Sequence, residues 1–427
     1  MKRVLIGAIG GAACCLGIWQ SARIGFARNL TERAVLTNAT AAADRAVRML
    51  PNDAETHAAL GIILQRTERY AEACGELERA IQLRPDDYFL WMLLGVTRDL
   101  NGQQDAADQA LKQSIVLAPT YAKPHWLLGN LLLRMRRTDE ALNELRIAAI
   151  SDQSLLPNVI DLVWGVSGHD AAETVRIIQP QTDTARMSLA IYFANQKQGP
   201  SAIQQFRAMQ SLDGENVHKL MTVLMDARLF VEAYEVWTKI HAASAGTPSL
   251  INGGFEDDIN LDQKGFGWRI AENTPSVRLS ADTSQYQEGK KSLRIDFRGN
   301  SNPAVPIVTQ LILVSPRTNY RVSFQTSSKE FVSPGRPVLV VNDASDEKDT
   351  LLAQSAALSG ASGWREFTLD FMTGDKTTAV RIGVVRQDCD NPCGAYGTIW
   401  LDAFIIKTRQ SDSPKAEKGP SAKSLTR

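Results

Sequence analysis

The chain has 427 residues, more than one hydrophobic core usually serves, so two or three domains are expected. It carries 47 Lys and Arg against 47 Asp and Glu. This balance argues against nucleic acid as a partner, because phosphate binding needs a concentrated basic face. A hydrophobic content of 44% also leaves no room for several membrane spans.

The N-terminus has a basic start and a short apolar stretch. Lys2 and Arg3 precede a run without charges from Val4 to Trp19. This pattern is typical of a signal peptide or signal anchor, although the run is slightly shorter than the about 20 residues that a span needs. Residues 1–22 are therefore predicted to be a membrane anchor, with the bulk of the chain periplasmic or extracellular. Secretion after cleavage of the signal is the alternative.

A motif with a period of 34 residues follows. Four of its positions recur three times each: Gly61, Gly95 and Gly129; Pro51, Pro85 and Pro119; Ala73, Ala107 and Ala141; Leu77, Leu111 and Leu145. The small residues suit places where two antiparallel helices approach closely, and each Pro ends a helix by removing an amide donor. The pattern predicts stacked helix pairs.

This pattern resembles the tetratricopeptide repeat over residues of about 29–241. Trp91 takes the family's Trp position, and His57 and His125 replace it in the neighbouring repeats. We expect clear repeats within residues 23–151 and degenerate ones within 152–241, where Leu189, Ala202 and Phe206 keep the offsets. Residues 29–50 are expected to form one long helix that leaves the membrane.

The resemblance implies a protein partner on the concave surface of the stack. In peptide-binding members a clamp of Lys, Asn and Arg holds a terminal carboxylate. Of the five corresponding positions here, only Lys123 matches; the other four are Ala58, Ile62, Leu93 and Leu127. The clamp is absent, and Ile62, Lys123 and Asn130 remain as candidate groove residues. A spacer without a partner is the alternative.

The composition changes at a linker of small residues, 242–249, and the helical period gives way to an alternation of period two. Leu293, Ile295 and Phe297 alternate with polar residues, and Val338 to Val341 is an unbroken apolar run. Short strands between Gly, Pro, Asn and Asp predict a jelly-roll β-sandwich over residues 250–407. The tail, 408–427, is polar and is expected to be disordered.

Motifs in this region look like those of carbohydrate-binding modules of families four and nine. The matching segments are Asn252 to Glu256, Gly267-Trp268, Gly289 to Leu293, Gln310, Pro316 with Tyr320, Trp364, and Gly397 to Asp402. The resemblance implies a galactose-binding-like fold, which also serves domains that bind no sugar.

Pyranose rings stack on aromatic side chains, and their hydroxyls need planar polar groups. The candidate carbohydrate-binding residues are Trp268, Gln310, Tyr320, Trp364 and Tyr396. Against this, Trp268 and Trp364 match positions that often anchor the two sheets. Arginines on the polar strand faces could suit an acidic glycan but more often lie on a solvated face; they are Arg294, Arg298, Arg321, Arg381 and Arg386.

The family often holds a structural Ca²⁺, and the resemblance would place Glu256 and Asp402 among its oxygen ligands. The alternative is two carboxylates that form hydrogen bonds at strand ends. The segment Cys389 to Cys393 has the spacing of a local disulfide, with two unpaired thiols as the alternative.

The sequence thus predicts a multidomain protein: an anchor helix, an all-α helical repeat region and an all-β jelly roll. Its predicted function is a membrane-anchored, non-catalytic adaptor with protein partners on the repeats and a glycan or protein on the sandwich, in envelope or exopolysaccharide assembly. A structural interaction protein without sugar binding is one alternative, and a glycan-modifying enzyme is another. No cofactor other than Ca²⁺ is expected.

Overall fold

The computed structural model describes residues 2–241, 250–257, 265–270, 276–303, 305–358, 363–387, 389 and 393–409, with side chains from Cys15 onward. The chain divides into two compact units, residues 1–189 and 190–427. The predicted linker, 242–249, and residues 410–427 of the predicted tail lie outside the described residues.

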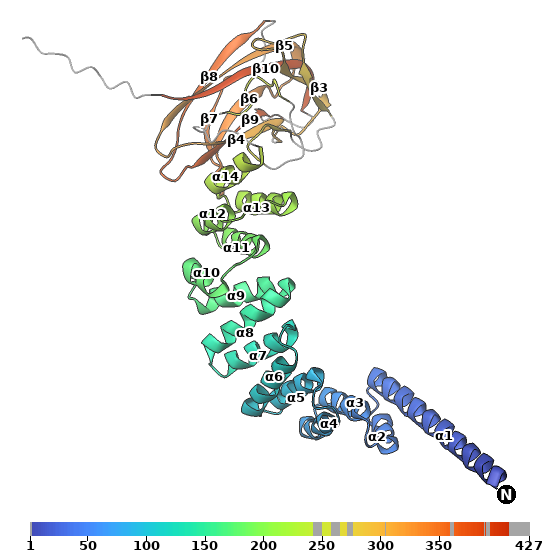
Figure 1. The fold of residues 1–427 in the computed structure, drawn as a ribbon. Helices are drawn as coiled ribbons and strands as arrows, with labels where there is room; N and C mark the ends of the chain where they lie inside the picture. Colours follow the sequence, from blue (N-terminus) through green and yellow to red (C-terminus); the bar gives the residue numbers. More distant parts are fainter. Residues whose placement is uncertain are drawn as a thin grey trace, which may run out of the picture. The chain divides into compact units, whose positions relative to one another are not determined.

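The first unit consists of helices that pack as antiparallel neighbours (Figure 1). Their bounds are α1 Lys2–Thr37, α2 Thr40–Met49, α3 Ala54–Arg66, α4 Tyr70–Leu83, α5 Tyr88–Leu100, α6 Gln104–Leu117, α7 Ala122–Arg134, α8 Thr138–Ser151, the 3₁₀ turn η1 Gln153–Leu155, α9 Leu156–Val166 and α10 Ala171–Ile178. Helix α11, Asp183–Asn195, contains the boundary between the units.

The repeat glycines permit close contact within each helix pair. A Cβ atom added to Gly95 would lie 2.6 Å from Cγ of Leu111, and one added to Gly129 would lie 2.6 Å from Cγ of Leu145. Leu111 and Leu145 are fully buried, so they have no free space into which to move. The recurring Gly and Leu positions of the sequence are therefore one contact made again in successive pairs, which confirms the predicted helical repeats.

The same hydrogen bond recurs at the variable Trp position of the repeat. Trp91 donates its indole Nε1 to the carbonyl of Pro85 at 2.7 Å. Nε2 of His57 lies 3.0 Å from the carbonyl of Pro51, and Nε2 of His125 is placed in the same way against Pro119. Histidine thus replaces tryptophan here by supplying the same ring N–H donor. This contact gives both histidines a structural role.

The expectation of one long helix over residues 29–50 is wrong. Helix α1 continues to Thr37, and α2 begins at Thr40. Asn38 lies between them with a φ of 51°, a left-handed conformation that Asn tolerates better than most residues. The chain therefore turns back, and α1 and α2 pack together as a pair. Among the described residues, no helix has the length and apolar character of a membrane span.

The described residues of the second unit form three further helices and ten strands. The helices are α12 Gly199–Arg207, α13 Gly214–Asp226 and α14 Phe230–His241. The strands are β1 Arg269–Ile270, β2 Val277–Asp282, β3 Ser292–Asn300, β4 Val308–Leu313, β5 Asn319–Val332, β6 Pro337–Asp343, β7 Leu351–Gln354, β8 Arg365–Met372, β9 Ala379–Arg386 and β10 Gly394–Thr408. Strand β10 thus extends into the predicted tail by one residue.

The strands form two antiparallel five-stranded sheets with the orders β1-β4-β9-β6-β7 and β2-β3-β10-β5-β8. The predicted alternation is confirmed in β3, where Leu293, Ile295 and Phe297 all belong to the buried core. Their neighbours on the same strand point away from that core. The predicted β-sandwich is therefore correct, and its core separates two outer faces.

Within the second unit, the turn between α13 and α14 is bonded to the sandwich. Arg228 donates from Nη1 to the carbonyls of Ala344 at 2.5 Å and Asp346 at 2.7 Å. An aromatic contact adds to this bond, because the rings of Tyr234 and Phe266 meet edge to face at 4.9 Å. The last helix pair and the sandwich are therefore connected by specific contacts.

Candidate functional site

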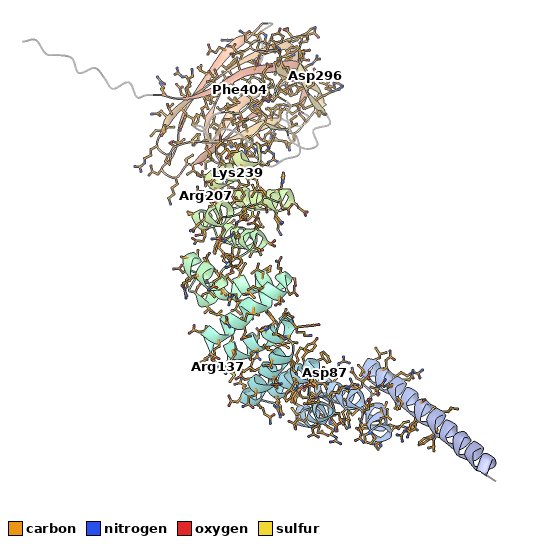
Figure 2. The ribbon with its side chains drawn as sticks, in the orientation of Figure 1. Asp87, Arg137, Arg207, Lys239, Asp296 and Phe404 are labelled. Atoms are coloured by element: carbon orange, nitrogen blue, oxygen red, sulfur yellow. A yellow bond between two sulfur atoms is a disulfide. The ribbon has the colours of Figure 1, made fainter. Side chains whose placement is uncertain are left out.

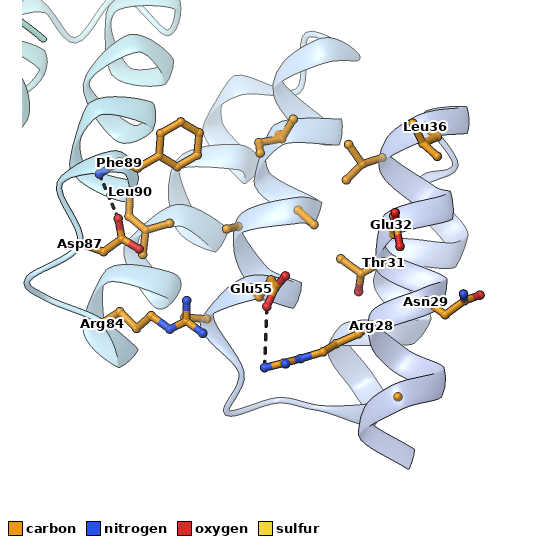
Figure 3. A pocket seen from close by; sticks show the side chains of 16 residues that line it. Arg28, Asn29, Thr31, Glu32, Leu36, Glu55, Arg84, Asp87, Phe89 and Leu90 are labelled. Atoms are coloured by element: carbon orange, nitrogen blue, oxygen red, sulfur yellow. Dashed lines mark hydrogen bonds and ion pairs between the residues drawn. The ribbon is translucent and has the colours of Figure 1, made fainter. Parts of the chain in front are cut away.

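A groove of about 740 Å³ lies between α1, α3 and α5 in the first unit (Figure 3). Its apolar lining includes Leu36, Ile62, Phe89 and Leu90. Phe89 is 43% exposed, which is unusual for a large ring that could pack against the stack. An exposed ring at the edge of an apolar groove is the kind of side chain that anchors a protein partner.

Charges of both signs surround this apolar lining. Arg28 on α1 lies 3.7 Å from Oε2 of Glu55 on α3, and both side chains are about half exposed. Glu32, Arg84 and Asp87 also line the groove. Because acids and bases are mixed, the groove does not select a strongly charged ligand.

The three predicted groove residues do not lie together. Ile62 lines the groove, whereas Lys123 and Asn130 lie on α7, which contributes no residue to it. Lys123 is exposed, and the Asn130 side chain donates to the carbonyl of Trp126 at 2.7 Å. Phe89 was missed because only its exposure distinguishes it from a core residue.

Three of the five predicted sugar-binding residues are in the interior of the sandwich. Trp268 and Tyr320 belong to the core, and their polar groups are engaged by backbone atoms: Trp268 Nε1 donates to the carbonyl of Asn252, and the Tyr320 hydroxyl accepts from the amide of Ser315. Gln310 is 1% exposed, and its amide bonds both the N–H and the carbonyl of Ile251. These side chains have almost no surface to offer a ligand.

The other two predicted residues lie nearer to solvent. Trp364, just before β8, is half-buried, and its buried indole Nε1 has no hydrogen-bond partner among the described residues. Tyr396 on β10 is 58% exposed. Its neighbour Ala395 is in the core, so Tyr396 points to the outer face of the β2-β3-β10-β5-β8 sheet.

The strand pairing places polar side chains in rows next to Tyr396 on this outer face. Arg298 is directly opposite Tyr396, and Asp296 is opposite Thr398. The Asp296 Oδ1 atom accepts hydrogen bonds from Arg294 Nε at 3.0 Å and from the Thr398 hydroxyl at 2.8 Å. These groups hold one another in fixed positions, which is the preorganisation that a sugar site requires.

A second carboxylate fixes the adjacent part of the same face. Asp282 accepts from the indole Nε1 of Trp400 at 2.9 Å and from the amide and hydroxyl of Ser284. Burial opposes ionisation of this carboxyl, but the hydrogen bonds outweigh that effect and hold its pKa at about 2. The guanidinium of Arg294 lies over the Trp400 ring at 5.7 Å. Asp282 therefore fixes the Trp400 ring, over which the Arg294 guanidinium lies.

The two predicted calcium ligands lie beside one turn, residues 287–291. Oε1 of Glu256 accepts from the amides of Lys290 and Lys291, and Oδ2 of Asp402 accepts from those of Gln287 and Glu288. Burial raises the pKa of the Asp402 carboxyl, whereas the backbone hydrogen bonds lower that of Glu256. The carboxylates therefore cap a turn of the main chain.

These hydrogen bonds occupy Oε1 of Glu256 and Oδ2 of Asp402, two of the oxygens that a Ca²⁺ ion would need. The Lys291 ammonium also lies 2.7 Å from the carbonyl of Glu256, where its charge would repel a cation. In this arrangement the residues fit a capped turn better than a calcium cage.

Cys389 and Cys393 form a disulfide, with their Cα atoms 5.8 Å apart. The buried Arg386 side chain donates to the carbonyl of Cys393 at 2.6 Å and to the hydroxyl of Ser301 at 2.9 Å. Burial lowers the pKa of this guanidinium. Three of the arginines considered for an acidic glycan are thus already engaged. Arg386 is buried, and Arg321 and Arg381 form ion pairs with Asp370 and Asp349.

Family models match a segment in each half of the chain. A family model described as a carbohydrate binding domain matches residues 247–391, and one described as a tetratricopeptide repeat matches residues 54–87. No curated protein matches the chain.

Several solved structures are similar to parts of the chain. "MamA RS-1 ArsTM double mutant" is 21% identical, with 31% of this chain and 74% of that chain covered and a TM-score of 0.29. "MamA 41-end from Desulfovibrio magneticus RS-1" is 17% identical, with coverages of 43% and 92% and a TM-score of 0.29. "CBM4 structure and function" is 18% identical, with coverages of 38% and 99% and a TM-score of 0.29. The helical region is thus similar to tetratricopeptide repeats, and the C-terminal sandwich is similar to carbohydrate binding domains.

Proposed function

We propose that the chain is a membrane-tethered, non-catalytic adaptor that binds a protein with its repeats and a glycan with its sandwich. The observation that carries the protein-binding half is the open groove with the exposed Phe89 ring at its edge. The glycan-binding half is supported by the family match and by Tyr396 beside an ordered polar network. A tether, a partner groove and a glycan-binding face together suit assembly of an envelope or an exported polysaccharide.

The tether is proposed from the N-terminal sequence and from the exposure of helix α1. Leu16, Ile18 and Trp19 are each more than half exposed on a helix that continues into the repeats. Apolar side chains without a protein cover suit a lipid environment. The basic residues Lys2 and Arg3 favour an orientation that places the repeats outside the cytoplasm.

The groove can be tested by photo-crosslinking in cells that make the full chain. A photoreactive phenylalanine analogue at Phe89 is expected to give a discrete protein adduct, because this ring borders the groove. The matched control is the analogue at Val116, which is 71% exposed on α6 and does not line the groove. In addition, Phe89→Ala should weaken binding of the identified partner by about tenfold or more, as loss of an aromatic anchor usually does.

Equal adducts at both positions would show that the groove is no docking surface. No adduct at Phe89 would favour the alternative, a structural spacer that holds the sandwich away from the membrane.

Calcium binding stays a prediction, and the capped turn provides its test. Because five hydrogen bonds from backbone amides already hold the carboxylates of Glu256 and Asp402, we expect the same hydrogen-exchange rates at residues 287–291 in millimolar Ca²⁺ and in excess EGTA. Glu256→Gln should speed exchange at Lys290 and Lys291 in both buffers, since the neutral amide is a weaker acceptor. Slower exchange in Ca²⁺ that disappears in Glu256→Gln would instead establish a calcium site.

A further inference from the structure

The outer face of the β2-β3-β10-β5-β8 sheet has an excess of exposed cations. One cross-strand row contains Arg278, Asp296, Thr398 and Lys329, in strand order. The adjacent row pairs Arg298 with Tyr396. We call Arg278, Arg298 and Lys329, together with Tyr396, the basic face. Its three cations come from three different strands, so the sheet pairing alone brings them together.

Of the acids on this part of the sheet, Asp296 and Asp282 are already engaged by other groups, and only Glu330, which follows Lys329 on β5, is exposed. Asp296 is mostly buried and is used by Arg294 and Thr398, and Asp282 is buried beneath Arg294. Arg298 has a side chain that is 61% exposed and approaches Asp296 only to 4.0 Å. Among the described residues, Arg278 and Lys329 have no ion-pair partner. The face therefore presents positive charge to solvent.

Tyr396 supplies the apolar part of the same surface. Its exposed ring lies between Arg298 on β3 and Val332 on β5, and Val332 is 70% exposed. A backbone irregularity between Tyr396 and Thr398 interrupts the regular pairing with β5. A flat ring with a guanidinium beside it can stack against a pyranose and bind a carboxylate on that sugar at the same time.

We propose that the basic face binds an acidic polysaccharide of the uronate class. One sugar ring stacks on Tyr396, and Arg298 and Lys329 hold carboxylates of the polysaccharide. The proposal rests on the glycan-binding function proposed above and assigns the site and the ligand class. Strands are about 4.8 Å apart, so Arg278 and Lys329 are separated by about 14 Å. That distance exceeds one sugar ring, which favours a chain of charged units over a single sugar.

The sheet itself favours a glycan over other polyanions. The Arg294–Asp296–Thr398 network places fixed donors and acceptors beside the ring, which suits hydroxyl recognition. A nucleic acid or an anionic membrane would need only charge and would make no use of these fixed hydrogen-bonding groups.

The test is calorimetric titration of the full chain, in mild detergent, with an oligogalacturonate and with the same oligosaccharide after methyl esterification. Esterification removes the charge and keeps the ring. We expect the acid form to bind at least about tenfold more tightly at low salt, with the difference shrinking as salt rises. Arg298→Gln and Tyr396→Ala should each lower affinity for the acid form by about tenfold.

The matched control is Arg317→Gln, because the Arg317 side chain is 74% exposed, against 61% for Arg298, and lies between β4 and β5, away from the basic face. It should leave affinity within about twofold. Equal binding of both oligosaccharide forms, or equal losses in Arg298→Gln and Arg317→Gln, would overturn the proposal.

Further binding measurements distinguish a failure of this proposal from a failure of the glycan-binding function on which it rests. A neutral glycan on an array that binds independently of Arg298 would leave the glycan-binding function standing and remove the acidic ligand. No binding to any glycan would remove both. Binding to phosphatidylglycerol vesicles or single-stranded DNA, without binding to the oligogalacturonate, would replace the glycan by another polyanion.

Discussion

Gly397→Ala is expected to lower the free energy of unfolding of the sandwich by about 3 to 5 kcal/mol. Gly397 has a φ of 106°, a conformation that L-residues rarely adopt. A Cβ atom at this position would also lie 2.7 Å from Cα of Phe331 on the neighbouring strand. The obstacle is backbone in a central pair of strands, so no side chain can rotate to relieve it.

The substitution also disturbs the basic face, because Tyr396 and Thr398 flank Gly397. Hydrogen exchange measured by mass spectrometry on the full chain should show faster exchange in β5 and β10, with the repeat helices α3 to α8 unchanged. Gly363→Ala is the control, since a Cβ there meets nothing within 4 Å and its φ is not positive. Unchanged exchange in β10 of Gly397→Ala would show that the strands do not meet as closely as described.

Asp282→Asn is expected to lower the free energy of unfolding of the sandwich by about 2 kcal/mol at pH 7. The reason is the difference between the carboxyl pKa of about 2 in the folded chain and the ordinary value of about 3.9 in the unfolded chain. Ionised Asp282 is held by Trp400 and Ser284, and an amide cannot accept all of these hydrogen bonds.

The pH dependence follows from the same difference. Because the folded carboxyl has the lower pKa, the unfolded chain binds more protons between the two values, and acid favours unfolding. The contribution of Asp282 is complete above about pH 5 and is lost as the pH falls through about 3.9 towards 2. Asp282→Asn should lack this part of the acid sensitivity, so its loss relative to the parent chain should shrink as the pH is lowered.

Exchange in β2, β3 and β10, corrected for the intrinsic pH dependence of amide exchange, measures both effects. Asp375→Asn is the control, because this carboxylate is 80% exposed and forms only a loose ion pair with Arg317. It should change stability by less than about 0.5 kcal/mol. A loss in Asp282→Asn that stays constant from pH 7 to pH 3 would mean that the charge of Asp282 does not stabilise the sandwich.

The helical repeats could be predicted from the sequence because their contacts are local and periodic. Gly95 and Leu111 lie on consecutive helices joined by one turn, and the same sequence spacing recurs at Gly129 and Leu145. The break at Asn38 was missed because an α-helix and a left-handed Asn are both compatible with the same apolar spacing. The alternation in β3 likewise fixed which side chains enter the sandwich core.

The arrangement of the sandwich surface could not be predicted in this way. Gln310 and Tyr320 have the chemistry of a sugar site, but only the tertiary structure shows that backbone atoms use their polar groups: those of Ile251 for Gln310 and that of Ser315 for Tyr320. Conversely, Arg298 becomes relevant only when β3 pairs with β10 and places it opposite Tyr396. Strand order is a long-range property, and a single sequence carries little information about it.

The bond from Arg228 to the sandwich has a consequence for how the chain is synthesised. Its acceptor carbonyl at Ala344 is 116 residues further along, which at 5 to 20 residues per second corresponds to about 6 to 23 s of translation. During the first part of that interval Tyr234 lacks its contact with Phe266, and throughout it the Arg228 guanidinium lacks the Ala344 carbonyl. The surface of the α13–α14 pair that contacts the sandwich is therefore exposed until the strands have been synthesised. A chaperone that covers this surface during synthesis would improve the yield of folded protein.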